Sequence, residues 1–115
     1  MNNLLFSLQG IVDSLNDKLL CISLGANGSM YKLNDLENHV KSMKVKPIDT
    51  TGAGDAFYAG ILANISGYKK EDWTKELLDQ AFLFGNICGA LNTLGKGAID
   101  NLPTKEEVLE KINLI

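Results

Sequence analysis

The sequence has 115 residues, and its 11 basic and 14 acidic side chains give a formal net charge of −3 at pH 7. Hydrophobic residues make up 45% and charged residues 22%, a composition typical of one globular domain rather than of a disordered tail. The acidic balance argues against a nucleic-acid partner, and no apolar run reaches the roughly 18 residues that a membrane span requires.

The first half of the chain predicts one helix followed by short strands. Apolar residues recur at helical spacing over residues 3–16, which predicts an amphipathic helix. Residues 19–23 form a continuous apolar run, typical of a strand covered on both faces. Turn residues at 25–28 separate this run from a second predicted strand at 29–33. The lysine-bearing segment 37–45 predicts an extended strand near a sheet edge.

The second half predicts three helices. Residues 56–65 are apolar on nearly all sides and predict a buried helix, although three strands offer too little surface to cover it. A long helix is predicted over 71–94, where small residues between 85 and 90 would let a neighbour approach closely. Thr104 and Glu107 have the spacing of a capping box that begins the last helix. This order of elements predicts the α/β class, and the apolar excess indicates part of a larger layered fold or a chain that associates.

Metal and thiol chemistry have little support in the sequence. Cys21 and Cys88 each lie in an apolar run, so we expect buried thiols rather than a disulfide. His39 is the single histidine, which argues against a zinc site or a histidine-based triad, and its polar surroundings predict a surface position. Residues 1–10 lack the basic start and the cleavage site of a signal peptide, so we expect a cytoplasmic protein.

The segment 49–55, DTTGAGD, is the strongest chemical signal in the chain. A Gly-Ala-Gly run directly before a helix turns backbone amides toward one point at the positive end of the helix dipole, where a phosphate binds. Such amides matter here because the chain contains no arginine. Asp55 follows the run and is placed to take a proton from a bound hydroxyl, as phosphoryl transfer requires. An alternative stays open, in which Asp55 is an N-cap and the glycines form only a turn.

Residues 49–62, DTTGAGDAFYAGIL, resemble the C-terminal signature of the ribokinase-like carbohydrate kinases, the phosphofructokinase-B family. Residues 23–28, SLGANG, are similar to the nucleotide loop of that family. Residues 86–98, NICGALNTLGKGA, resemble its helix and loop around adenine and a monovalent cation. Residues 102–108 are similar to the tail of fructokinases, and the resemblance is most convincing from 19 to 108.

The resemblance implies that residues 1–115 form a single partial domain. This domain would be the C-terminal part of a three-layer α/β/α ribokinase-like fold, with a few strands followed by helices. The implied reaction transfers the γ-phosphoryl group of ATP to a sugar hydroxyl, with fructokinase the nearest type. ATP and a sugar are the implied partners, and Mg²⁺, bound chiefly through the phosphates, and K⁺ are the implied ions. We also expect the chain to associate with further copies or with the sugar-binding part that family members carry. Two other functions stay open, a non-catalytic nucleotide-binding fragment and a self-associating remnant.

The family's functional residues can be carried over position by position. Asp55 is implied as the catalytic base that contacts the sugar hydroxyl. The anion hole is implied at Gly52, Ala53 and Gly54. Contacts to the nucleotide are implied for Ser23, Gly25, Ala26, Gly28 and Asn86. Oxygen ligands for a monovalent cation are implied at Asp49, Thr51, Asn92, Gly95, Gly97 and Asn101. The glycines have the alternative role of turn formers, and Asn86 that of an ordinary polar helix residue.

Overall fold

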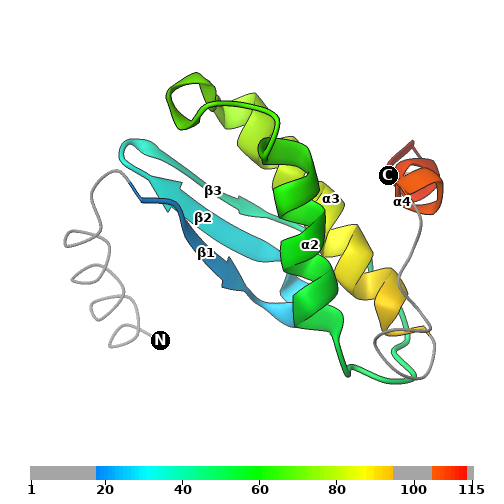
Figure 1. Cartoon of the computed structure of the whole chain (residues 1–115). Coiled ribbons are helices and arrows are strands. Elements are labelled where there is room, and N and C mark those ends of the chain that lie inside the picture. The colour runs from blue at the N-terminus through cyan, green and yellow to red at the C-terminus, as the bar shows by residue number, and fades with distance from the viewer. Residues whose placement is uncertain (1–17, 95–104, 114–115) are drawn as a thin grey trace, which may run out of the picture.

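The computed structural model describes residues 18–94 and 105–113 (Figure 1). The helix predicted over 3–16 lies outside the described residues. The strands are β1 (Leu20–Ser23), β2 (Ser29–Leu33) and β3 (Leu36–Val40). The helices are α2 (Ala53–Ile65), α3 (Lys75–Asn92) and α4 (Lys105–Asn113), with short 3-10 helices η1 (Gly25–Asn27) and η2 (Lys70–Asp72). The predicted order of strands followed by helices is confirmed, and β2 has the predicted bounds.

The three strands form an antiparallel sheet in the order β1-β2-β3. Alternate residues of β2 point toward the helices, and Ser29, Tyr31 and Leu33 are therefore buried. The core above β2 contains residues of α2 and α3, namely Phe57, Ile61, Ile65, Leu78, Ala81 and Phe82. As predicted, the third strand is at an edge of this sheet.

The helices α2 and α3 run side by side and approach closely through glycines (Figure 1). A Cβ atom at Gly60 would lie 2.9 Å from the Cα atom of Gly85, and one at Gly85 would lie 2.7 Å from the carbonyl oxygen of Phe57. Real Cβ atoms do not pack that closely, so both positions require glycine at this helix separation. The prediction that small residues on the long helix admit a close neighbour is confirmed, and the neighbour is α2.

The last helix packs on α3 through Val108, whose side chain is fully buried. It joins a second core cluster that includes Ile87 and Leu91 of α3. The capping residue predicted at Thr104 lies outside the described residues, and α4 begins at the next position.

The third strand is shorter than predicted, because it ends at Val40 rather than at residue 45. Its partner β2 begins at Ser29, which pairs with Val40, so the residues after Val40 have no neighbour in β2. Residues 41–47 instead cross over α3 without regular structure. The first strand also differs from the prediction. In the part of the chain that the structure describes, β1 is an edge strand and is only half-buried, rather than covered on both faces.

Two predicted helices begin at other residues. The predicted helix 56–65 begins at Ala53, because Gly52 adopts a left-handed conformation and occupies the N-cap. The helix predicted from 71 begins at Lys75, because Thr74 is extended and its Oγ1 accepts a hydrogen bond from the amide of Leu77. Trp73 and η2 precede it as a separate turn.

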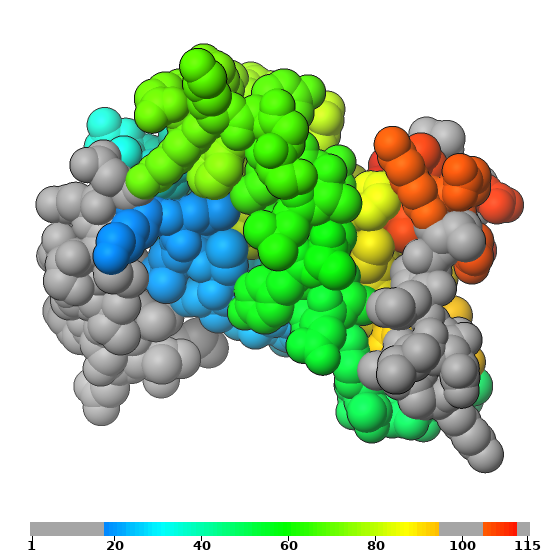
Figure 2. Space-filling view, viewed as in Figure 1, coloured from blue at the N-terminus to red at the C-terminus, as the bar shows by residue number. Residues whose placement is uncertain are grey.

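The helix α2 is buried on one side only (Figure 2), so the predicted buried helix is covered in part, as the shortage of strand surface implied. Phe57 and Ile61 face the core, whereas Tyr58 is 44% and Leu62 60% exposed. The small sheet and α3 cover the first side and leave the second open, as expected where three strands face so apolar a helix.

The cysteines and the histidine occupy the expected environments. Cys88 is buried and Cys21 is partly buried; both are free thiols, and burial raises the pKa of each to about 11. His39 is exposed. Among residues 18–94 and 105–113, no helix has the length and apolar character needed to cross a membrane.

Candidate functional site

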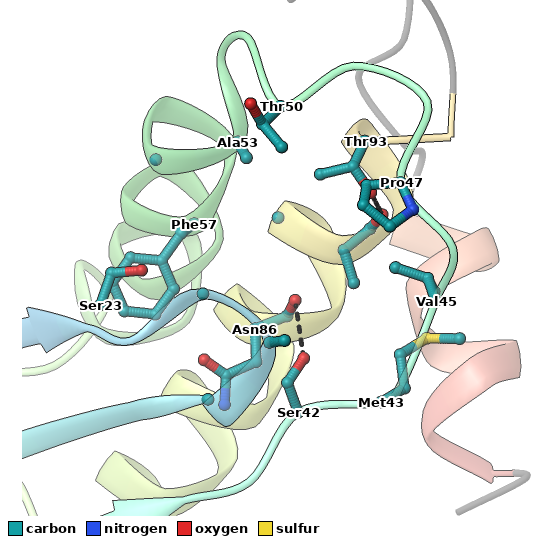
Figure 3. A pocket seen from close by; sticks show the side chains of 16 residues that line it. Ser23, Ser42, Met43, Val45, Pro47, Thr50, Ala53, Phe57, Asn86 and Thr93 are labelled. Carbon is teal, nitrogen blue, oxygen red and sulfur yellow. Dashed lines mark hydrogen bonds between the residues drawn. The ribbon is translucent and has the colours of Figure 1, made fainter.

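A cavity of about 210 Å³ lies where four segments of the chain meet (Figure 3). These segments are the turn after β1, residues 41–47, the beginning of α2 and the second half of α3. Seven residues predicted to contact a nucleotide or phosphate line it, namely Ser23, Gly25, Ala26, Gly28, Ala53, Gly54 and Asn86. These residues are up to 63 positions apart in the sequence, so only the fold brings them together.

The turn after β1 is shaped by two glycines with positive φ, 60° at Gly25 and 89° at Gly28. A Cβ atom at Gly28 would collide with the carbonyl oxygen of Val40, so the turn sits directly against the end of β3. The amide of Leu24 donates to the carbonyl oxygen of Gly28 at 2.8 Å and closes the turn. Gly28 is therefore required both for its backbone angle and for the space it leaves.

The predicted anion hole lies at the N-terminus of α2, with one correction. Gly52 is the N-cap, with φ of 80°, whereas Ala53 and Gly54 already belong to the first helical turn instead of preceding it. Ala53 and Gly54 line the cavity, and Gly52 does not. Helix geometry leaves the amides of the first turn without acceptors inside the helix, so they can bind an anion.

Asp55 lies in the first turn of α2, as predicted, and it is exposed. Because Gly52 occupies the N-cap, the alternative that Asp55 is the capping residue is wrong. Asp55 does not line the cavity but follows directly after Gly54, which does. A group held at the first turn of α2 would therefore lie close to a carboxylate on the same turn.

Asn86 connects α3 to the segment that follows β3. Its side chain is almost fully buried, and Nδ2 donates to the carbonyl oxygens of Val40 at 2.9 Å and of Lys41 at 3.3 Å. Ser42 Oγ in turn donates to the backbone carbonyl of Asn86 at 3.4 Å (Figure 3). Asn86 thus satisfies backbone groups where the sheet ends, a structural role that accompanies its place in the cavity wall.

The predicted cation ligands within the described residues lie at the C-terminal end of α3. The amides of Ile48 and Asp49 both donate to the carbonyl oxygen of Thr93, at 2.7 and 2.9 Å. Asp49 Oδ1 accepts the amide of Thr51 at 2.9 Å, and Asn92 is buried on the last turn of α3. The other predicted ligands, Gly95, Gly97 and Asn101, lie outside the described residues.

The available donors near Asp49 are oxygens, which suit a hard monovalent or divalent cation. Among the described residues, no group of three or more His, Cys, Asp or Glu side chains is placed to hold a metal ion. The carbonyl and carboxylate ligands that the family resemblance implies for a monovalent cation therefore stay a prediction.

The remaining cavity residues were not predicted from the sequence. They are Ser42, Met43, Val45, Pro47, Thr50, Phe57, Gly89, Ala90 and Thr93. Apolar side chains predominate among them, with three hydroxyl groups, as in pockets that bind small organic ligands. Lysines alternate with Met43, Val45 and Pro47 in this segment, and the pattern distinguishes a side that faces solvent from a side that faces the cavity. The same alternation predicts a strand, whereas residues 41–47 are irregular.

Comparisons with known proteins agree with this geometry. The profile described as "pfkB family carbohydrate kinase" matches residues 1–105. Fructokinase-1 of Zea mays is 43% identical over 95 residues, which cover 83% of this chain and 29% of that protein.

Two solved structures are also similar. A fructokinase from Vibrio cholerae, solved with fructose, ADP and calcium ion and, as a double mutant, with potassium ion, is 38% identical. It matches with a TM-score of 0.80 over 90% of this chain and 33% of its own. A putative ribokinase II from E. coli, solved with ATP and Mg²⁺, is 25% identical and matches with a TM-score of 0.78 over 93% of this chain and 33% of its own.

The chain spans about a third or less of the length of these relatives. Within that span, the profile match covers most of the chain, and Ala53, Gly54 and the turn after β1 line one cavity. This chain belongs to the pfkB family of carbohydrate kinases and has its ribokinase-like α/β fold.

Proposed function

We propose that the chain supplies the nucleotide-binding and phosphoryl-transfer part of an ATP-dependent sugar kinase of the fructokinase type. The observation that carries this proposal is the cavity, which gathers the predicted loop residues and the first turn of α2 around one space. The names of the relatives, fructokinases among them, support fructose as the sugar.

In this proposal, the cavity holds the nucleoside part of ATP between residues 41–47 and α3. Met43, Val45 and Pro47 offer apolar surface on one side and Ala90 on the other, which suits a purine ring. The turn at Gly25 and Gly28 brings backbone groups close to the ribose and phosphates, because Gly25 has no side chain and Gly28 lets the turn close against β3.

The phosphates extend toward the first turn of α2. The amides of Ala53 and Gly54 stabilise the negative charge on the transferred group, helped by the positive end of the helix dipole. Asp55 accepts the proton of the sugar hydroxyl as the hydroxyl oxygen attacks the γ-phosphorus; the bond from this phosphorus to the bridging oxygen of the β-phosphate breaks, and ADP leaves. Bound magnesium would supply further charge neutralisation on the phosphates, and oxygen ligands near Asp49 would hold a potassium ion.

The sugar itself is held by the remaining two thirds of the fold that the relatives possess. Without those residues the hydroxyl is not positioned, and proximity alone contributes about 7–11 kcal/mol to such reactions. We therefore expect this chain alone to bind MgATP but to show no measurable phosphorylation of fructose in a coupled ADP-release assay. Efficient phosphorylation of fructose by the chain alone would contradict the proposal that the sugar is held by the remaining two thirds of the fold.

Titration calorimetry with MgATP tests the nucleotide site directly. Ala90→Leu places a larger side chain in the cavity and should weaken MgATP binding by at least tenfold, because the added methyl groups occupy the space of the ligand. The matched control is Ala59→Leu on the exposed side of α2, outside the cavity, which should bind as the unsubstituted chain does. Equal loss in both variants, or none in either, would contradict the proposal.

Association is a second proposed property, and a specific observation favours it. The open side of α2 carries Tyr58 and Leu62, large apolar side chains that remain exposed. We expect the chain to self-associate through this side or to bind there the missing part of the fold. Light scattering of the unsubstituted chain and of Leu62→Lys should show a larger mass for the former. A monomer in both cases would contradict self-association through this side of α2.

A further inference from the structure

The turn formed by residues 24–28, which contains η1, is one wall of the cavity. Its internal hydrogen bonds are all local: the amide of Leu24 donates to the carbonyl of Gly28 at 2.8 Å, that of Asn27 to Leu24 at 3.1 Å and that of Gly28 to Gly25 at 3.1 Å. The N-cap residue of η1 makes no side-chain capping bond. Two of the five residues are glycines, which lose much conformational freedom when ordered. A contact from outside the turn is therefore valuable for keeping its shape.

His39 provides such a contact from β3. Its ring Nε2 lies 2.6 Å from the backbone carbonyl oxygen of Asn27, 12 residues earlier in the chain. A carbonyl oxygen can only accept, so Nε2 carries the proton and donates it. This bond joins the turn to a neighbouring strand, whereas the bonds inside the turn join residues at most four positions apart.

The backbone beneath His39 is itself anchored to α3. Asn38 Oδ1 accepts the amide of His39 at 2.9 Å, and Asn38 Nδ2 donates to Asp79 Oδ1 at 2.9 Å. Asp79 belongs to α3 and also accepts the hydroxyl of Tyr31 at 2.5 Å. The imidazole ring therefore extends from a strand position that is anchored to α3 to a turn whose own hydrogen bonds are all local.

We propose that His39 is a positioning residue, whose Nε2–H holds the 24–28 turn in the shape that forms the cavity wall. His39 does not line the cavity, so it acts through Asn27 rather than by touching a ligand. The effect on nucleotide binding rests on the function proposed above, whereas the effect on the turn does not. The sequence alone indicated only a surface histidine.

Three variants separate this role from a general effect of altering the strand. His39→Ala removes the donor, and His39→Gln restores an N–H donor on a side chain of similar length. Glu37→Ala is the matched control, because Glu37 is exposed on the same side of β3, two residues away, and pairs with Lys32 at 3.3 Å instead of with the turn.

Amide hydrogen exchange of the full chain measures the turn itself. The amide of Leu24 reports on the closure of the turn, and the amide of Phe82, in the middle of α3, reports on global unfolding. We expect His39→Ala to accelerate exchange at Leu24 about three- to tenfold more than at Phe82, the range that corresponds to the loss of one hydrogen bond. His39→Gln should reverse most of this change, and Glu37→Ala should not cause it.

Titration with MgATP measures the consequence for the cavity. We expect His39→Ala to weaken binding by about three- to tenfold, with recovery in His39→Gln. Unchanged exchange at Leu24 in His39→Ala, or equal acceleration at Leu24 and Phe82, would overturn the role of His39. If the unsubstituted chain failed to bind MgATP, the proposed function would fail, and the exchange rates would still decide the role of His39.

Discussion

Near its N-terminal end, α3 contributes Asp79 to a closed network of polar side chains, whereas its second half forms a wall of the cavity. Asp79 accepts Tyr31 Oη at 2.5 Å and Asn38 Nδ2 at 2.9 Å on one oxygen, and Lys75 Nζ lies 2.9 Å from the other. The side chains that bond to Asp79 in this network, those of Tyr31, Asn38 and Lys75, all belong to this chain.

The second half of α3, which lines the cavity, is arranged differently. Gly89 and Ala90 have little or no side chain, and the N-terminus of α2 beside them presents backbone amides. Asp79, within its network, stabilises the fold, while Asp55, exposed on the first turn of α2, stays accessible to a ligand. The comparison shows that the polar groups of the Asp79 network are satisfied within the protein, whereas Asp55 and the first-turn amides of α2 are accessible, as the proposed function requires.

Asp55 gives the largest expected effect. We expect Asp55→Asn to lower kcat by about 10²–10⁴ in a kinase assembled from this chain and the remaining two thirds of a homologous fructokinase. The amide keeps the shape of the carboxylate but cannot accept the proton, so MgATP affinity should persist. Asp49→Asn is the control and should chiefly raise the potassium concentration needed for full activity. Near-normal kcat in Asp55→Asn would show that another group is the base.

Substitution of Gly28 tests whether the cavity wall depends on the close approach to β3. Gly28→Ala should lower the free energy of unfolding by about 2–5 kcal/mol, because it combines a positive φ with a collision at Val40. Gly67→Ala is the control, since a Cβ atom there meets nothing within 4 Å, and it should change stability by less than about 0.5 kcal/mol. Urea unfolding measures both, and similar values for the two variants would contradict the prediction.

The network around Asp79 should yield a smaller effect, confined to stability. Tyr31→Phe leaves the buried ring in place and removes only its hydroxyl. This change should lower the free energy of unfolding by about 1–3 kcal/mol. MgATP binding should change little, since Tyr31 does not line the cavity. Tyr68→Phe, at a side chain that is 56% exposed, provides the matched control. A loss of nucleotide affinity in Tyr31→Phe larger than its loss of stability would show that the two ends of α3 are coupled.

The pH dependence of stability should show the smallest effect. Burial alone would raise the pKa of Asp79, but hydrogen bonds from Lys75, Tyr31 and Asn38 outweigh it and hold the pKa below its ordinary value of 3.8. Because the folded carboxyl binds a proton less readily than the unfolded one, its stabilisation is complete above that ordinary value. The stabilisation is lost as the pH falls through the folded pKa.

Urea midpoints between pH 7 and pH 2 check this sign. The stability difference between the unsubstituted chain and Asp79→Asn should shrink as the pH falls below about 4. Gly67→Ala alters no charge and should show a difference that does not vary with pH. A difference for Asp79→Asn that stays constant or grows toward pH 2 would mean that the network does not stabilise the carboxylate form.

Features that depend on neighbouring residues were predicted well. The bounds of β2, the helix after the Gly-Ala-Gly run and the place of Asp55 on its first turn all follow from patterns a few residues long. The grouping of the cavity residues was implied by the family resemblance rather than by any local pattern. Neither the local sequence patterns nor the family resemblance predicted the hydrogen bond between His39 and Asn27.

Short stretches of the sequence thus determined which segments become strands and helices and which turn requires glycine, because these features depend on backbone angles and on the nearest side chains. Only the tertiary structure decided where β3 ends, which side of α2 is buried and which residues line the cavity. Each of these depends on groups far apart in the sequence. Asn86, 46 positions after Val40, donates to the carbonyl oxygens of Val40, the last residue of β3, and of Lys41, which follows it. No pattern within either segment encodes that contact, since it exists only when α3 packs against the sheet.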